Sequence, residues 1–254
     1  MYLPLYIAKR YLFSKKFYQA VNIISIIATI SVVVGTMALV VILSVFNGFD
    51  DLVHTLYNKF NPDILIQSSQ GKCFIVDSNL INNIKQIDGI DQLTFVIEDK
   101  ALVIYEDKQT IATIKGVSSN YNKVTKIESA IIQGNYKIVD NTNYCLIGQG
   151  IAYTLDINIS LPLYQQIEVY FPGKNKGNII LNPEALLKRK FITPTAIFSI
   201  EGDIDNQYII VPIDFARNLF EYDNKITSIE IKLDNEKKTK LIQNKIKQIL
   251  GPDF

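Results

Sequence analysis

The chain contains AVNIISIIATISVVVGTMALVVILSVF at residues 20–46, and no charged residue occurs between Lys16 and Asp50. Apart from Asn22, the only polar side chains in this stretch are serines and threonines. A helix rises about 1.5 Å per residue and the hydrocarbon core of a membrane is about 30 Å thick, so roughly 20 such residues span it. The stretch therefore predicts a transmembrane helix over residues 20–46.

Two other readings of the stretch are weaker. A cleaved signal peptide has an apolar core of about 7–15 residues and an A-x-A-like cleavage site, whereas this core is longer and closes on SVFNGF. A buried helix of a soluble protein would carry polar residues on one face, and here that face offers only small hydroxyls.

The residues that flank the span indicate its orientation. Residues 1–19 contain four basic side chains and no acid, namely Lys9, Arg10, Lys15 and Lys16, whereas the distal flank opens with Asp50 and Asp51. Basic flanks stay in the cytoplasm, so we expect a cytoplasmic N-terminus, an inner-membrane location and an extracytoplasmic domain over residues 47–254. The leader 1–19 mixes aromatics with basics, which indicates either an amphipathic helix along the inner leaflet or an extension of the span into water.

Small side chains mark one face of the predicted span. Ser31, Gly35 and Ala38 are spaced to share a helical face, and Ser31 with Gly35 forms a small-xxx-small pair. The opposite face consists of large aliphatic residues, so the small face is a candidate packing site for a second helix, although small residues are common in such helices by chance.

Residues 47–254 predict a mixed α+β domain, which we expect to have two lobes. Alternating β-rich runs predict strands at 63–69, 93–106, 109–117, 145–148, 166–171, 195–200, 207–212 and 228–233. The second and third should form a hairpin. Apolar spacing predicts helices at 78–90, capped by Ser78 and ended by Gly89, and at 151–157, 212–220 and 236–250. The last should bury Leu241, Ile242, Ile246, Ile249 and Leu250. Cys73 and Cys145 could form a disulfide in an oxidising compartment or remain buried thiols.

The sequence predicts neither an enzyme nor a cofactor site. A single histidine, His54, and the lack of clustered metal ligands argue against a metal centre, and no phosphate-binding loop is present, so no ATP hydrolysis is expected. The acidic pair Glu98-Asp99 is read as solvated turn charge. Lys plus Arg number 26 against 25 Asp plus Glu, which gives no basic field for nucleic acid.

Together, YIAKRYLFSKK, SVFNGFDDLV, CLIGQGIAYTLDI, QIEVYFP, TPTAIFSIEGDID, YIIVPIDFARNLF and SIEIKL resemble, in order and spacing, ABC-transporter permeases of the lipoprotein-releasing (LolC/LolE-like) type. These belong to the wider group of macrolide-exporter (MacB-like) and cell-division permeases. The resemblance covers essentially the whole chain. It implies a membrane-anchored α+β chain with a MacB-like periplasmic core domain.

The resemblance also implies partners. Such permeases have four transmembrane helices, pair with a second permease as homo- or heterodimers, and sit on a cytoplasmic ABC ATPase whose ATP-driven motion releases a lipoprotein to a periplasmic carrier. The sequence ends at GPDF, where the second span is expected, so we interpret it as an N-terminal fragment or truncated product. Open alternatives are a single-span envelope sensor or scaffold, and a cell-division-type permease that regulates a cell-wall hydrolase.

A long segment, PGKNKGNIILNPEALLKRKFITP at 172–194, separates two predicted strands. By resemblance, a loop at this position hooks the carrier protein. The candidate partner-binding residues are Pro172, Gly173, Lys174, Lys176, Ile179, Ile180, Leu181 and Pro183, and the alternative is an ordinary surface excursion.

Overall fold

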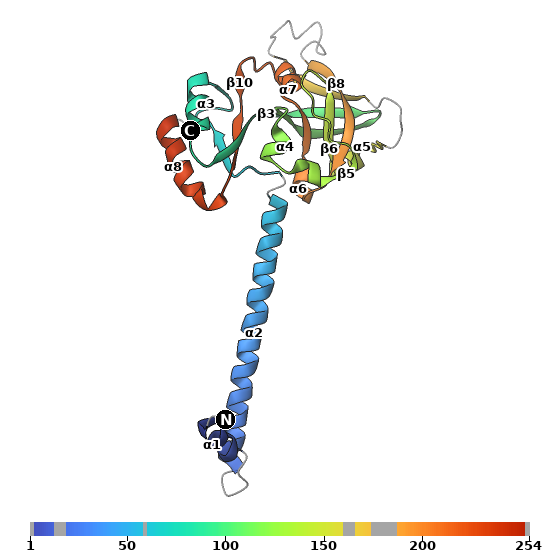
Figure 1. Ribbon diagram of the computed structural model, residues 1–254. Helices are drawn as coiled ribbons and strands as arrows, with labels where there is room; N and C mark the ends of the chain where they lie inside the picture. The colour runs from blue at the N-terminus through green and yellow to red at the C-terminus, as the bar shows by residue number, and fades with distance from the viewer. Residues whose placement is uncertain (1–2, 13–18, 58–59, 160–165, 174–186, 252–254) are drawn as a thin grey trace. The chain divides into compact units, whose positions relative to one another are not determined.

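The computed structural model describes residues 3–12, 19–57, 60–159, 166–173 and 187–251 (Figure 1). The chain divides into two compact units, Met1–Thr55 and Leu56–Phe254. The first unit contains α1 (Leu3–Leu12) and most of α2 (Gln19–Tyr57). Leader residues 13–18 lie outside the described ranges.

Helix α2 is continuous over 39 residues. Among the described residues, its segment Ile23–Asp50 is long and apolar enough to cross a membrane. Hydroxyls within this segment donate to the helix's own carbonyls: Thr29 to Ser25 at 2.7 Å, and Ser31 to Ile27 at 2.8 Å. Such internal bonds satisfy polar groups that lipid could not. The helix continues beyond the apolar stretch, which ends at Phe46, as far as Tyr57, and the second compact unit begins at Leu56.

The second unit alternates short helices with strands. Its strands are β1 (Ile64–Gln67), β2 (Phe74–Ile75), β3 (Ile90–Tyr105), β4 (Lys108–Val117), β5 (Ile131–Gly134), β6 (Tyr144–Gly148), β7 (Ile167–Pro172), β8 (Leu187–Phe198), β9 (Tyr208–Pro212), β10 (Lys225–Ile226) and β11 (Ser228–Leu233). Its α-helices are α3 (Ser78–Lys85), α4 (Tyr121–Val124), α5 (Gln149–Leu155), α6 (Gly202–Asp205), α7 (Ile213–Phe220) and α8 (Thr239–Leu250). The 3₁₀ turns are η1 (Ile127–Ala130) and η3 (Glu236–Lys238).

The main sheet closes on itself. Its strands pair in the order β1, β11, β3, β4, β9, β6, β8 and β5, and β7 pairs with both β8 and β3. The strands β3, β4, β9, β6, β8 and β7 therefore form a closed ring, in which β4 with β9 and β6 with β8 are parallel. Closure removes exposed strand edges from this part of the domain.

Strand β3 belongs to two regions of the domain. Its first part pairs with β11, beyond which lies β1, and its last part pairs with β4 and β7. Figure 1 shows α3 and α8 beside one end of this strand and β5, β6 and β8 beside the other. The two expected lobes are thus two regions of a single compact unit, because one 16-residue strand runs through both.

Side chains alternate between the two faces of the sheet along each strand, and this alternation separates two hydrophobic clusters. Ile97 of β3 and Ile147 of β6 belong to the larger cluster, whereas their neighbours Val96 and Leu146 belong to the smaller one. Successive side chains of a strand point to opposite faces, so the clusters fill opposite faces of the sheet. Helices α5 and α7 contribute to the larger cluster, and α4 and η1 to the smaller.

Several predicted details were wrong at the ends of elements. Helix α3 is capped by Asp77, whose carboxylate accepts from the amide of Asn79, and not by Ser78. The helix ends at Lys85, and Gly89 instead forms a turn with φ +100°. In α8 the side chains of Ile242 and Ile246 are buried, whereas Leu241 is exposed.

The structure also tests the predictions made for Asp99 and for the two cysteines. Asp99 is not in a turn but within β3, half-buried, where it accepts a hydrogen bond from Tyr222 Oη at 2.7 Å. Cys73 and Cys145 are both free thiols, and Cys145 is fully buried in β6. Burial raises the pKa of the Cys145 thiol because the thiolate would lose its hydration.

Candidate functional site

The predicted partner-binding segment falls mostly outside the described residues. Lys174, Lys176, Ile179, Ile180, Leu181 and Pro183 all lie between 173 and 187 and are not described. Pro172 ends β7, opposite Leu187 of β8, and Gly173 follows it. The segment therefore connects two paired antiparallel strands, and whether it binds a partner stays a prediction.

The C-terminal part of that segment was predicted wrongly. Residues 187–194 belong to β8, because its register with β7 begins at Leu187. Lys188 and Arg189 consequently lie on a strand, where Lys188 Nζ is 3.2 Å from Glu221 Oε1 and Arg189 pairs with Glu168. These side chains stabilise the base of the hairpin and are not loop cations.

The predicted helix-packing face of α2 is open. Ser31, Gly35 and Ala38 are exposed, and a Cβ added at Gly35 would meet no atom within 4 Å. Its role in packing against a second helix stays a prediction.

Asp63, six residues after the end of α2 in the sequence, is bound to β11 by three hydrogen bonds. Its amide donates to Ile231 O at 3.1 Å, and its carboxylate accepts from Leu233 N at 2.7 Å and from Lys232 Nζ at 2.8 Å. The Asp63 side chain is 4% exposed. Hydrogen bonds to a charged group that is largely buried are among the stronger ones in proteins. Asp63 is therefore held on β11.

Phe60 forms the second part of this attachment. Its ring is buried in the smaller cluster, and Lys115 Nζ lies 4.3 Å from the ring centroid. The Tyr208 ring meets it edge-on at 4.8 Å. A cation over an aromatic face is attracted by the ring quadrupole, and the attraction is stronger where both groups are shielded from water.

Below Phe60, Lys115 of β4 and Glu230 of β11 form an ion pair across β3. Nζ and Oε1 are 2.6 Å apart, and the side chains are 4% and 3% exposed. Burial raises the pKa of Glu230, although the positive charge of Lys115 opposes this effect. Burial acts to lower the pKa of Lys115, but Tyr121 and the Glu230 carboxylate together outweigh it, so the pKa lies above the ordinary lysine value. We call Phe60, Asp63, Lys115 and Glu230 the junction cluster.

Sequence reasoning missed the junction cluster. Lys115 lies within the apolar stretch TIKGV and Glu230 lies between two isoleucines in SIEI, and this was the available signal. The alternating pattern singled out neither residue.

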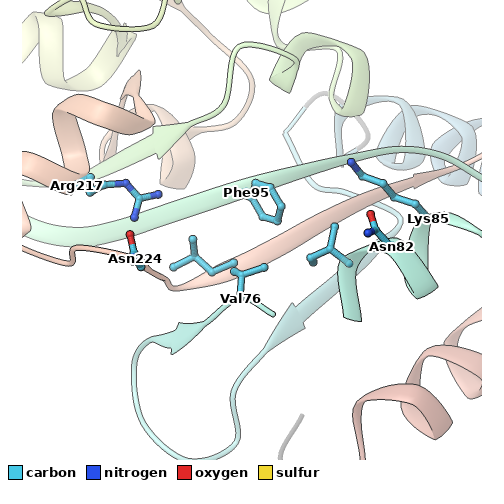
Figure 2. A pocket seen from close by; sticks show the side chains of 8 residues that line it. Val76, Asn82, Lys85, Phe95, Arg217 and Asn224 are labelled. Carbon is cyan, nitrogen blue, oxygen red and sulfur yellow. The ribbon is translucent and has the colours of Figure 1, made fainter. Parts of the chain in front are cut away.

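A groove of about 430 Å³ is lined by residues of α3, β3, α7 and β10, together with Val76, which follows β2, and Asn224, which precedes β10. Figure 2 shows Arg217 beside Asn224 at one end and Lys85 beside Asn82 at the other, with Phe95 between them. Val76, Ile81 and Ile226 complete an apolar floor. Within the described ranges, no group of three or more Cys, His, Asp or Glu side chains is placed to hold a metal ion.

Comparisons with known proteins agree with this architecture. The sequence model of the MacB-like periplasmic core domain family matches residues 25–249. The lipoprotein-releasing system transmembrane protein LolE of Haemophilus influenzae is 24% identical over 237 residues, covering 91% of this chain and 55% of LolE. LolC of Buchnera aphidicola subsp. Schizaphis graminum is 25% identical, covering 92% and 57%. The chain thus spans little more than half the length of these relatives.

A solved structure shares the fold. The extracellular domain of the noncanonic ABC-type transporter YknZ from Gram-positive bacteria superposes with a TM-score of 0.52 at 17% identity, covering 73% of this chain and 90% of that one. At this identity the likeness concerns the fold alone. With the family match over residues 25–249, it leads to one conclusion: the chain belongs to the family of proteins with a MacB-like periplasmic core domain.

Proposed function

We propose that this chain is the N-terminal portion of an ABC-transporter permease of the lipoprotein-releasing type. Support comes from the LolE and LolC relatives, which align over more than nine-tenths of the chain, and from the apolar segment Ile23–Asp50. ATP hydrolysis would belong to a separate cytoplasmic subunit. A second permease, identical or related, would complete the transporter.

The observation that carries this proposal is the junction cluster. A permease that moves its periplasmic domain by ATP-driven motion needs an unbroken helix and a firm attachment where the helix meets the domain. Helix α2 is unbroken to Tyr57, and Phe60 and Asp63 are then held by buried contacts to β4 and β11. We propose that Phe60 and Asp63, which follow the helix in the sequence and are held on the sheet, receive the motion of the helix.

The orientation follows the charge of the flanks. We infer a cytoplasmic N-terminus, with the domain from Leu56 onward in the periplasm and the helix in the inner membrane. Residues 173–186, at the end of the β7–β8 hairpin, would dock a periplasmic carrier, and the cargo would be a lipoprotein. The hairpin base is fixed by the Arg189–Glu168 and Lys188–Glu221 pairs, which would lower the ordering cost of docking.

Depletion of the protein in the cells that encode it tests the proposal. We expect newly made acyl-labelled lipoproteins to accumulate in the inner-membrane fraction of a density gradient, and the intact gene to restore their transfer. A variant lacking residues 174–186 should retain inner-membrane insertion and ATPase association but lose crosslinking to the carrier.

Other outcomes would change the assignment. Unchanged lipoprotein distribution with a defect in cell-wall cleavage would favour a cell-division-type permease. No change in either, together with no associated ATPase, would favour an envelope sensor.

A further inference from the structure

The groove of about 430 Å³ that contains Phe95 has two polar ends and an apolar middle. Each end carries one cation and one amide, Arg217 with Asn224 and Lys85 with Asn82, and the described residues that line the groove include no acidic side chain (Figure 2). The middle is formed by Phe95 together with the floor residues named above. None of these residues belongs to the junction cluster or to the β7–β8 hairpin.

The polar groups of the groove have bonding capacity left. Within the part of the chain that the structure describes, Lys85 makes no ion pair, and the side-chain amides of Asn82 and Asn224 make no hydrogen bond. Arg217 donates to the carbonyls of Asp223 and Lys225, in both cases through Nη1. These contacts fix the guanidinium at the groove and leave Nη2 for an acceptor, since a guanidinium has five N–H donors.

The shape of the groove favours an extended peptide over an acyl chain. A lipid tail is held in an enclosed apolar cavity, whereas Asn82, Lys85 and Asn224 are exposed along this groove. Side-chain amides both donate and accept, which suits the alternating groups of a peptide backbone. A single anionic headgroup would also meet only one of the two cations.

We propose that this groove binds an extended segment of a partner protein that has an apolar centre and an acidic residue on each side. The two carboxylates would pair with Lys85 and Arg217, the apolar centre would cover Phe95, and the amides of Asn82 and Asn224 would bond the backbone. This binding site is separate from the release activity proposed above and does not depend on it.

Binding of synthetic peptides to the full chain in phosphatidylcholine nanodiscs tests this site. The probe is a fluorescent peptide with two central leucines and one glutamate on each side, followed by polarisation. Replacing both glutamates with glutamine, or both leucines with serine, should weaken binding. Lys85→Glu should weaken binding of the acidic peptide by about fivefold or more, since it replaces attraction by repulsion.

A charge exchange and a matched variant make the test specific. A peptide with lysine in place of one glutamate should bind Lys85→Glu better than it binds the wild-type chain. Lys245→Glu makes the same charge change at an exposed residue of α8 that does not line the groove, and should leave both affinities unchanged within about twofold. Near-ultraviolet circular dichroism establishes that each variant is folded.

Three results would overturn the proposal. One is failure of the wild-type chain to bind the acidic peptide up to its solubility limit. Another is an equal loss of affinity in Lys85→Glu and Lys245→Glu. The third is Lys85-dependent binding of myristate without binding of the peptide, which would make the groove an acyl-carboxylate site.

Discussion

Lys115 Nζ lies 2.6 Å from Glu230 Oε1, and the bond crosses the strand between them, from β4 over β3 to β11. Both side chains are almost completely buried, beneath Phe60. The pair therefore joins β4 to β11, the strand to which Asp63 is bound.

Removing one member of this pair should be costly. Lys115→Met leaves the Glu230 carboxylate buried without its counter-charge, and we expect a loss of about 3–5 kcal/mol in the free energy of unfolding. The double variant Lys115→Met/Glu230→Leu should recover much of that loss, because no charge remains buried. Thermal unfolding of the full chain in detergent, followed by circular dichroism, measures both. Additive losses in the double variant would show that the two residues act separately.

Phe60 should matter for coupling more than for folding. Phe60→Leu keeps an apolar side chain but removes the ring that faces the Lys115 ammonium. In the assembled transporter we expect an unchanged ATPase rate with lipoprotein release reduced severalfold. Phe198→Leu removes a fully buried aromatic ring from the same hydrophobic cluster and serves as the control. Equal release by the two variants would make Phe60 an ordinary core residue.

The base of the β7–β8 hairpin should weaken in acid. Tyr170 Oη donates to Glu168 at 2.6 Å and Arg189 pairs with it, and these contacts lower the pKa of Glu168. A lowered folded pKa stabilises the fold above the ordinary pKa of glutamate, and that stabilisation is lost as the pH falls through the folded value.

Glu168→Gln should accordingly lower the free energy of unfolding by at most about 1 kcal/mol at neutral pH, since the pair is partly exposed. Its Tm and that of the wild-type chain should converge as the pH falls. Glu201→Gln, an exposed control, should follow the wild-type profile throughout. A difference between Glu168→Gln and wild type that stays constant with pH would rule out the linkage.

Gly148 should tolerate no side chain. A Cβ there would collide with the backbone of Asp205. The carboxylate of Asp205 holds that backbone in place, because it accepts from Ser199 Oγ and Ile200 N. Since backbone cannot rotate away, Gly148→Ala should destabilise the domain by roughly 1–3 kcal/mol. Gly202→Ala, where a Cβ meets nothing within 4 Å, is the matched control for thermal unfolding. Equal Tm values would mean that the β6–α5 turn shifts at little cost.

The small face of α2 should govern association with a second helix. Gly35→Leu fills the close-approach position of the Ser31, Gly35 and Ala38 face, so we expect weaker helix association in bilayers, measured by energy transfer between labelled chains. Val33→Leu changes bulk on another face and should have little effect. Undiminished association of the Gly35 variant would place the contact elsewhere.

Much of the order of elements could be predicted because its signals are local. The length of the apolar stretch predicted the long helix within α2. Alternation of apolar and polar residues predicted β3, β4, β9 and β11 nearly at their observed bounds. The first residues of β8 were not predicted as strand, because the charged residues Lys188 and Arg189 interrupt the apolar alternation there. In the structure both side chains form ion pairs with residues outside β8. Strand β5 was not predicted, because its four residues carry too short a pattern.

The sequence by itself determined one long apolar helix and a domain of alternating strands and helices, because periods of 3.6 and 2 are properties of neighbouring residues. Only the tertiary structure decided that β7 closes the ring on β3 and that Lys115 meets Glu230, 115 positions later in the chain. Which strands pair depends on how much apolar surface they bury and on whether buried charges find partners in the assembled fold. Neither can be read from the sequence of one strand. The junction cluster and the groove exist for that reason only once the sheet has formed.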